Sequence, residues 1–418
     1  MIHRRRGVIA LAFVGLFAAG AAMAAFTVGP DDDPDAAATE VLATGESSAS
    51  SIPTSTSAAT TSTTTTAKPP PRTATLAFTG DLLPHSPVVR AAAAYQWERA
   101  ATDGWDFRPM FDEMRPILSA ADLAICHVES PVSSTDTDLS GYPVFNAPRA
   151  LVEAAIDAGY DGCSTASNHA FDRGADGVRS TVEVFEQLGI PQAGMAVDAA
   201  HDLEPVLYEV NGIVLGHISA TYSLNGFVMP ADEPYLVDLI EPEQIIAEAA
   251  LAKEAGADFV VVSLHWGNEY QHTPSAAQDQ WLAEILPSDE VDLVIGHHAH
   301  VVQPVDRVGD EWVVFGLGNF LSNQSANCCV AASQDGMIAH VTLLENEVGE
   351  IEVDAVAYTP TWVDRSQGYV IRVANGEPGR EGIAGELAAS AARTAEVVTS
   401  RLGPTDGLTE RAADGGAG

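Results

Sequence analysis

The residues best suited to chemistry are three histidines, His297, His298 and His300, which follow the short apolar stretch 293–295 and Gly296. Buried strands often end in functional loops, and this loop would present an imidazole cluster. His298 and His300, with one residue between them, can both face one metal ion from a tight loop. The pattern therefore predicts a strand that ends in a metal-binding loop.

Four more loops that follow predicted strands carry candidate ligands: Asp81, Glu129, the pair Asn168 and His169, and His265. Sites in open α/β sheets assemble at such strand ends. Carboxylate, amide and imidazole donors without a thiolate suit Mn, Fe or Zn. We expect two divalent transition-metal ions, which would clamp a phosphate and generate a hydroxide nucleophile. Glu129 is expected to bridge them.

His169 directly follows the expected ligand Asn168, so it is placed to protonate a leaving group. Asp172 lies three residues further on. It could orient the His169 imidazole or cap the next helix. His85 could complete the first metal site or be a surface histidine. His217, within a predicted hairpin, is expected in the core.

The elements that must position these residues alternate between apolar strands and helices, which is typical of an α/β domain. A hairpin is expected around Asn211-Gly212, with strands at 206–210 and 213–218. The other expected strands are 75–78, 123–126, 162–165, 259–264, 293–295, 312–315, 337–344 and 351–358. The expected helices are 110–121, 147–158 (opened by Pro148), 178–188, 243–255 and 381–402.

The first 72 residues differ from the rest of the chain. Residues 1–28 combine Arg4, Arg5 and Arg6 with an apolar run from Gly7 to Val28, which is typical of a signal peptide or a transmembrane anchor. We favour the anchor, with the remaining chain outside the cytoplasm, or secreted if the segment is cleaved. Residues 29–72, rich in Ser, Thr and Pro, are expected to be a disordered linker. The catalytic-type domain is expected at 73–375, and a C-terminal helix and polar tail at 376–418.

The composition limits the possible partners. With 58 acidic and 20 basic residues, the net charge of −38 argues against binding to nucleic acid, which requires a basic surface. Cys126 and Cys163 end apolar stretches and are expected to be small buried hydrophobic residues rather than a disulfide. Cys328 and Cys329 lie in a polar loop.

Six motifs, taken together, resemble the CapA family of bacterial capsule and poly-γ-glutamate synthesis proteins, which is similar to the calcineurin-like metallophosphoesterases. The resemblance covers roughly Thr73 to Arg365. The motifs are Thr79-Gly80-Asp81, Val128-Glu129-Ser130-Pro131, Ser167-Asn168-His169-Ala170-Phe171-Asp172-Arg173-Gly174, His265-Trp266-Gly267-Asn268-Glu269, Gly296-His297-His298-Ala299-His300-Val301-Val302-Gln303 and Leu317-Gly318-Asn319-Phe320.

This resemblance implies a four-layer α/β/β/α metallophosphoesterase-like fold. It also implies that Asp81 and His300 bind the first metal ion, that Glu129 bridges, and that Asn168, His265 and His298 bind the second. His169 would be the acid. The chain departs from the family at His127, where Asn is usual, at Ala299, where Pro is usual, and at Glu129, where the wider superfamily has Asp.

The leading functional expectation is a metal-dependent, hydrolase-like protein for synthesis or export of an anionic envelope polymer. Its partners would be the polymer or its precursor and membrane synthase subunits. One alternative is a phosphoesterase for nucleotides or envelope phosphates. Another is a non-catalytic, metal-containing subunit that binds the polymer or its synthase.

Overall fold

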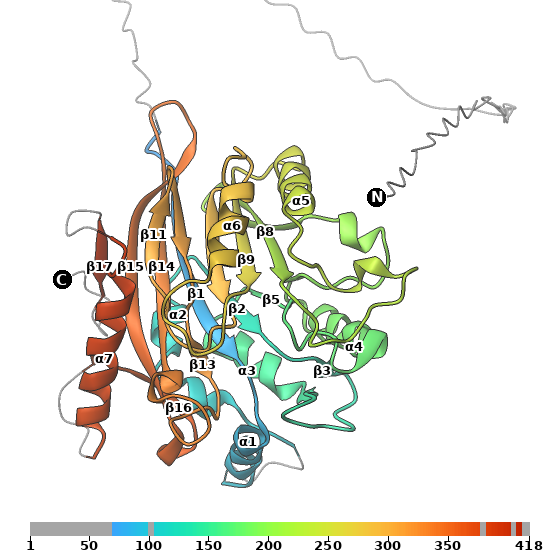
Figure 1. Ribbon diagram of the computed structural model, residues 1–418, viewed down its shortest axis with the longest axis vertical. Coiled ribbons are helices and arrows are strands. Elements are labelled where there is room, and N and C mark those ends of the chain that lie inside the picture. The colour runs from blue at the N-terminus through green and yellow to red at the C-terminus, as the bar shows by residue number, and fades with distance from the viewer. Residues whose placement is uncertain (1–68, 99–103, 377–381, 403–406, 412–418) are drawn as a thin grey trace, which may run out of the picture. The chain divides into compact units, whose positions relative to one another are not determined.

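The computed structural model describes residues 69–98, 104–376, 382–402 and 407–411. Within the unit from Lys68 to Gly418, these residues form two facing β-sheets with helices on the outer side of each sheet (Figure 1). Among the described residues, no helix is both long and apolar enough to cross a membrane. The predicted signal or anchor at 1–28 and nearly all of the linker at 29–72 lie outside the described residues.

The larger sheet is mixed, and its central strands run parallel from β1 to β6. The spatial order is β16 (Val370–Val373), β15 (Ile351–Asp364), β14 (Asp335–Glu345), β1 (Thr73–Leu82), β2 (Leu123–Val128), β5 (Gly162–Ser164) and β6 (Gln192–Ala193), with β13 (Asn319–Leu321) beside β1 and β17 (Leu408–Glu410) beside β15.

The second sheet faces the first and contains four parallel strands, from β8 to β12. Its order is β11 (Val305–Val308), β12 (Glu311–Val314), β10 (Leu293–His297), β9 (Phe259–His265), β8 (Ile213–Thr221) and β7 (Val206–Val210). A separate pair is formed by β3 (Val132–Ser133) and β4 (Ala147–Pro148). The hairpin expected at Asn211-Gly212 is confirmed, because β7 and β8 pair antiparallel around it.

Alternating side chains divide the core into layers, because successive residues of a strand point to opposite faces of its sheet. In β1, Leu76 and Phe78 point into the core between the two sheets, whereas Ala77 packs under the helices of the larger sheet. In β9, Val261 joins the core between the sheets and Val262 joins the core under the opposite helices.

Helices cover both outer faces. The larger sheet is covered by α1 (Ser86–Glu98), α2 (Arg115–Leu118), α3 (Ala150–Ala158) and α4 (Gly174–Leu188). The second sheet is covered by α5 (Pro242–Glu254) and α6 (Ala276–Ile285), and α7 (Ala384–Val398) packs beside β14 and β15 (Figure 1). The four-layer α/β/β/α sandwich predicted from the sequence is therefore confirmed.

Two of the expected helices differ from the prediction near a proline residue. The helix expected at 110–121 is divided into a 3₁₀ turn, Arg108–Phe111, and the short α2. Pro116 favours a helix start over a helix interior, because its ring cannot donate the hydrogen bond of a continuing turn. The helix expected from residue 147 begins at Ala150, since Ala147 and Pro148 form β4 instead.

The expectation that Cys126 and Cys163 do not pair is wrong. The two residues are buried, as expected, but they form a disulfide. They lie opposite each other on the neighbouring strands β2 and β5, with their Cα atoms 4.4 Å apart. Adjacent strands in this register bring the two Cβ atoms close enough for a bridge. Cys328 and Cys329 are free thiols.

Candidate metal centre

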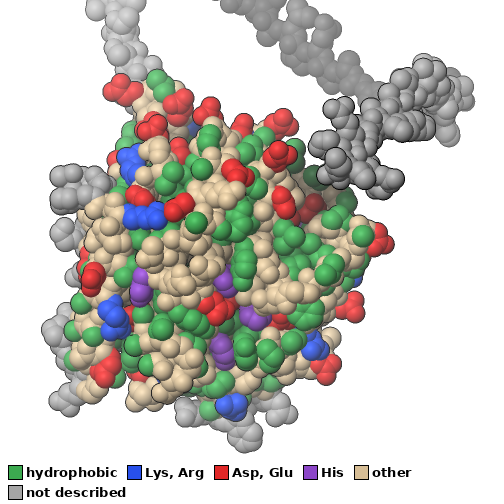
Figure 2. Space-filling model, viewed as in Figure 1, with side chains coloured by type: hydrophobic (Ala, Val, Ile, Leu, Met, Phe, Trp, Pro, Cys, Tyr) green, Lys and Arg blue, Asp and Glu red, His purple; other side chains and the backbone are tan. Residues whose placement is uncertain are grey.

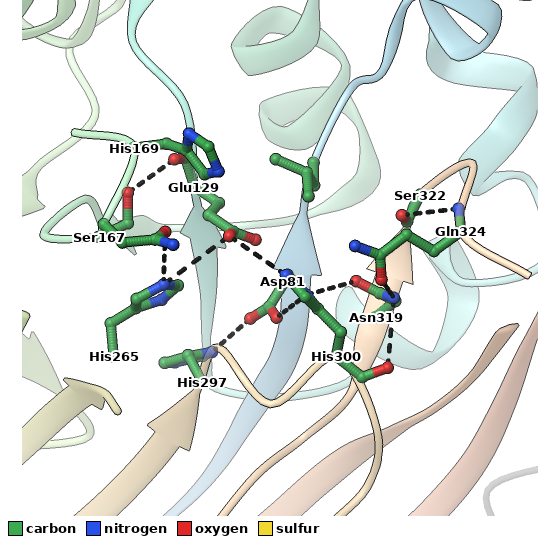
Figure 3. A network of polar contacts seen from close by, with 12 residues as sticks. Asp81, Glu129, Ser167, His169, His265, His297, His300, Asn319, Ser322 and Gln324 are labelled. Carbon is green, nitrogen blue, oxygen red and sulfur yellow. Dashed lines mark hydrogen bonds and ion pairs between the residues drawn. The ribbon is translucent and has the colours of Figure 1, made fainter. Parts of the chain in front are cut away.

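The residues proposed as ligands meet where parallel strands of both sheets end. All six are buried, and none exposes more than 3% of its surface. They are Asp81 in β1, Glu129 after β2, Asn168 after β5, His265 at the end of β9, and His298 and His300 after β10. Figure 3 shows side chains from the two sheets pointing toward one another across this junction. In Figure 2, histidine side chains reach the surface near the middle of the face shown.

One group of residues that could hold an ion contains Asp81, Glu129 and His300, whose candidate ligand atoms lie within 4.8 Å of one another. His300 Nδ1 lies 3.1 Å from Asp81 Oδ2, and its Nε2 lies 3.6 Å from Glu129 Oε1. Asn319, beside Asp81 on the neighbouring strand β13, holds this imidazole through its Oδ1, which is 3.1 Å from His300 Nδ1.

A second group, whose candidate ligand atoms also lie within 4.8 Å of one another, contains Glu129, His265 and His298. His265 Nε2 lies 3.7 Å from Glu129 Oε1 and 3.0 Å from Asn168 Oδ1. Glu129 belongs to both groups, which is the arrangement that a bridging carboxylate requires. The residues of these two groups are among those that the family resemblance assigned to the two positions, and Asn168 contacts the second group through His265.

Unsatisfied buried atoms at this junction fit bound cations. Both carboxylate oxygens of Glu129 and the Nδ1 of His298 are buried without a hydrogen-bond partner. Such groups destabilise a fold unless an ion or a partner compensates them. Burial raises the pKa of Glu129 well above its ordinary value. A cation between Glu129 and His298 would remove this penalty, and the donor set suits Mn, Fe or Zn.

The pKa of Asp81 is shifted in the opposite direction from that of Glu129. Burial alone would raise the pKa of the Asp81 carboxyl, but hydrogen bonds from His297 and His300 hold it well below its ordinary value. Burial would likewise lower the pKa of His300, but Glu129 and Asp81 raise it to about 9. Asp81 and His300 therefore stabilise each other's charged forms.

The backbone of the histidine loop is also unusual. His298 and His300 have φ angles of 84° and 54°, in the left-handed region that residues with a Cβ seldom adopt. Such backbone conformations persist where the surroundings impose them, and they cluster at functional sites. The loop thus has an unfavourable backbone conformation at both residues, and both imidazoles face the junction.

His127 and His297 are buried beside the proposed ligands and contact them. The His127 ring stacks on His297, with their centroids 4.0 Å apart, and its Nε2 is hydrogen-bonded to His265 Nδ1 at 2.9 Å. This bond leaves His265 Nε2 to face Glu129. His297 and His127 also form a further candidate group with Asp81, so their role could extend to binding an ion.

His169 and Asp172 form a hydrogen-bonded pair beside the candidate metal positions. His169 Nδ1 lies 2.8 Å from Asp172 Oδ2, which also accepts the backbone N–H of Phe145 at 2.7 Å. Helix α4 begins after Arg173 without a side-chain cap. Of the two roles considered for Asp172, the geometry therefore supports orientation of His169 rather than capping.

A cleft of about 520 Å³ opens onto His169. It is lined by His85, His169, Glu269, Tyr270 and His300 among others. His85 belongs to none of the candidate metal groups within the described residues. Burial lowers its pKa to about 4, and its ring packs against Phe145 in the cleft wall. His217 is a core residue, as expected, with Nε2 2.9 Å from Ser263 Oγ.

Sequence reasoning missed one acidic residue at the site. Glu269 is exposed and forms a candidate group with His298 and His300. Its only sequence signal was its place in the conspicuous segment that starts at His265, four residues earlier.

Comparisons with known proteins agree with the sequence resemblance. The model of a family described as "Bacterial capsule synthesis protein PGA_cap" matches residues 75–324. The chain is 27% identical to the PGA biosynthesis protein CapA of Bacillus subtilis over 255 residues, which are 59% of this chain and 64% of the relative. It is also 27% identical to the capsule biosynthesis protein CapA of Bacillus anthracis, over 60% of each chain.

The chain thus spans less than two thirds of the length of either relative. Among solved structures, the calcineurin-like phosphoesterase YfkN of Bacillus subtilis matches with 12% identity and a TM-score of 0.42, over 78% of this chain and 99% of that one. Since the family model matches more than half of the sequence, the chain belongs to the bacterial capsule synthesis protein family PGA_cap.

Proposed function

We propose that this protein is an extracytoplasmic, membrane-anchored hydrolase that depends on two divalent metal ions and acts in synthesis or export of a capsule polymer such as poly-γ-glutamate. The observation that carries the proposal is the pair of ligand groups joined by Glu129, next to the His169–Asp172 pair. The names of the relatives from two Bacillus species support the link to the polymer.

The metal ions would supply a water of lowered pKa and polarise the scissile group. Asp81, Glu129 and His300 would hold one ion, and Glu129, Asn168, His265 and His298 the other. In a protein with a net charge of −38, these ions would also be the local positive charge that draws in an anionic substrate.

The protein's own contribution to bond cleavage centres on His169. Its Nδ1 is engaged by Asp172, so Nε2 is the nitrogen that can hold a proton for the leaving group. The hydrogen bond to Asp172 fixes the orientation and the tautomer of the imidazole. Both residues are buried, and His169 lines the wall of the cleft, where a substrate would bind.

A phosphoesterase acting on nucleotides or envelope phosphates is the second candidate. The observation that favours it is the set of carboxylate and imidazole donors in the candidate groups, because such ligands suit the ions that bind phosphate. The His169–Asp172 pair would serve either reaction, since both leaving groups require a proton.

The test is to supply purified, metal-loaded protein with poly-γ-glutamate, nucleotides and nitrophenyl phosphate, and to measure polymer length and product release. Glu129→Gln, which removes the charge of the bridge, is the matched inactive variant. Cleavage of one substrate class by wild type and not by Glu129→Gln supports the corresponding reaction. Retention of polymer without turnover of any substrate would instead indicate a binding subunit.

A further inference from the structure

A loop segment that carried no sequence signal reaches the second metal position. Tyr222 and Asn225 lie just after β8, between that strand and the 3₁₀ turn at Pro234–Leu236. The Tyr222 backbone N–H donates to the carbonyl of His265 at 3.0 Å, and its ring lies 4.6 Å from that of His298. Asn225 Oδ1 accepts a hydrogen bond from Asn168 Nδ2 at 3.3 Å. The segment therefore contacts Asn168, His265 and His298.

The contact between Asn225 and Asn168 favours one orientation of the Asn168 carboxamide. Asn168 Oδ1 lies 3.0 Å from His265 Nε2, on the side where the second ion would bind, while Nδ2 points to Asn225. Only the oxygen of an amide can bind a cation. If the Asn168 amide rotated by half a turn, its oxygen would face Asn225 Oδ1, and two acceptors would meet.

Asn225 also has a backbone suited to this task. Its φ is 52°, in the left-handed region that Asn and Gly tolerate best, and Gly226 follows with a φ of 83°. The turn presents the Asn225 side chain toward Asn168, and its Nδ2 lies 3.4 Å from His169 Nδ1. Asn225 thus lies between the proposed ligand and the proposed acid.

We propose that Asn225 is a positioning residue, which fixes the Asn168 carboxamide with its oxygen toward the second metal ion and so sets the affinity of that position alone. The inference rests on the proposed dinuclear function. The first position is held differently, because Asp81 and His300 are hydrogen-bonded to His297 and Asn319 instead.

Two substitutions separate the side chain from the backbone. Asn225→Gly keeps the left-handed backbone and removes the carboxamide, whereas Asn225→Asp keeps an acceptor for Asn168 Nδ2. Asn211→Gly is the matched control, because Asn211 has the same φ of 52° but lies at the hairpin turn between β7 and β8. Circular dichroism melting would check that each variant is folded.

The measurement is calorimetric titration of the full, metal-stripped chain with Mn²⁺, together with elemental analysis after dialysis. We expect Asn225→Gly to weaken the binding of one of the two Mn²⁺ ions by ~10–100-fold, as is usual when a residue that orients a ligand is lost. The affinity for the other ion should be unchanged. Asn225→Asp and Asn211→Gly should bind the ions at least as tightly as wild type.

Three results would overturn the inference while leaving the dinuclear site standing: wild-type binding of both ions by Asn225→Gly, equal weakening of both, or an Asn225→Asp variant as weak as Asn225→Gly. If wild type itself binds fewer than two ions, the proposed dinuclear function fails together with the inference. The wild-type titration therefore separates the two failures.

Discussion

Substitution of His169 by Asn should separate proton transfer from metal binding. Asn keeps a polar side chain of similar reach but cannot hold a transferable proton at neutral pH. His169 lies outside the candidate metal groups of the described residues, so both ions should remain bound. Its partner Asp172 would still accept the backbone N–H of Phe145, so the local fold should persist.

The expected loss follows from the role of a positioned acid, which contributes ~10²–10⁴-fold to a rate. This corresponds to about 2.7–5.5 kcal/mol in the activation free energy. Asp172→Asn should cost less, because the amide oxygen can still accept from His169 Nδ1 and hold the imidazole in place. Substrates with good leaving groups, such as nitrophenyl phosphates, should be affected less than alkyl esters, since they depart without a proton.

The assay measures kcat of wild type and the variants with an alkyl phosphate ester and with a nitrophenyl phosphate. The metal content is measured on the same samples. His201→Asn, a substitution in the 3₁₀ turn His201–Leu203, is the control and should match wild type. Equal losses for both esters would contradict the role as acid. Full polymer production in cells that carry His169→Asn with intact metals would leave only a binding role.

Three further predictions concern the rest of the chain. Replacing both Cys126 and Cys163 by Ser should lower the free energy of unfolding by about 3–4 kcal/mol, for a disulfide that spans 37 residues, as measured by urea unfolding. Burial raises the pKa of Glu248 from its ordinary value of 4.5 to about 7, so the stability that its protonated form contributes should be lost as the pH rises between these two values. Glu248→Gln should flatten this dependence of the unfolding free energy on pH, and an unchanged slope would contradict the prediction. Removal of residues 1–72 should leave a soluble, folded chain, and a random-coil circular dichroism spectrum would show that the boundary at 73 is misplaced.

Much of the candidate site could be predicted because its residues follow apolar strands directly. The stretch before Gly296 forms β10, and that before His265 forms β9, so position along the chain was enough to place their loops at one edge of a sheet. Parallel strands carry such loops to the same side. The expectation that Glu129 bridges two ions also came from the sequence, since a carboxylate among imidazoles suits two cations.

The parts that could not be predicted depend on contacts between distant segments. Asn225 meets Asn168 across 57 positions of the chain, and nothing in its own neighbourhood signals that contact. The disulfide between Cys126 and Cys163 depends on which strands are neighbours and on their register. Each cysteine ends an apolar stretch of sequence, and such a stretch is as typical of a free buried cysteine as of a disulfide-bonded one.

The central claim is a pair of metal ions joined by Glu129, and anomalous diffraction from crystals of the protein grown with Mn²⁺ tests it most directly. We expect two anomalous peaks about 3.5–4 Å apart on either side of the Glu129 carboxylate. One peak should disappear in His298→Ala, which removes a ligand of the second position only. Absence of peaks at this junction, or an ion bound elsewhere with Glu129 unliganded, would contradict the account.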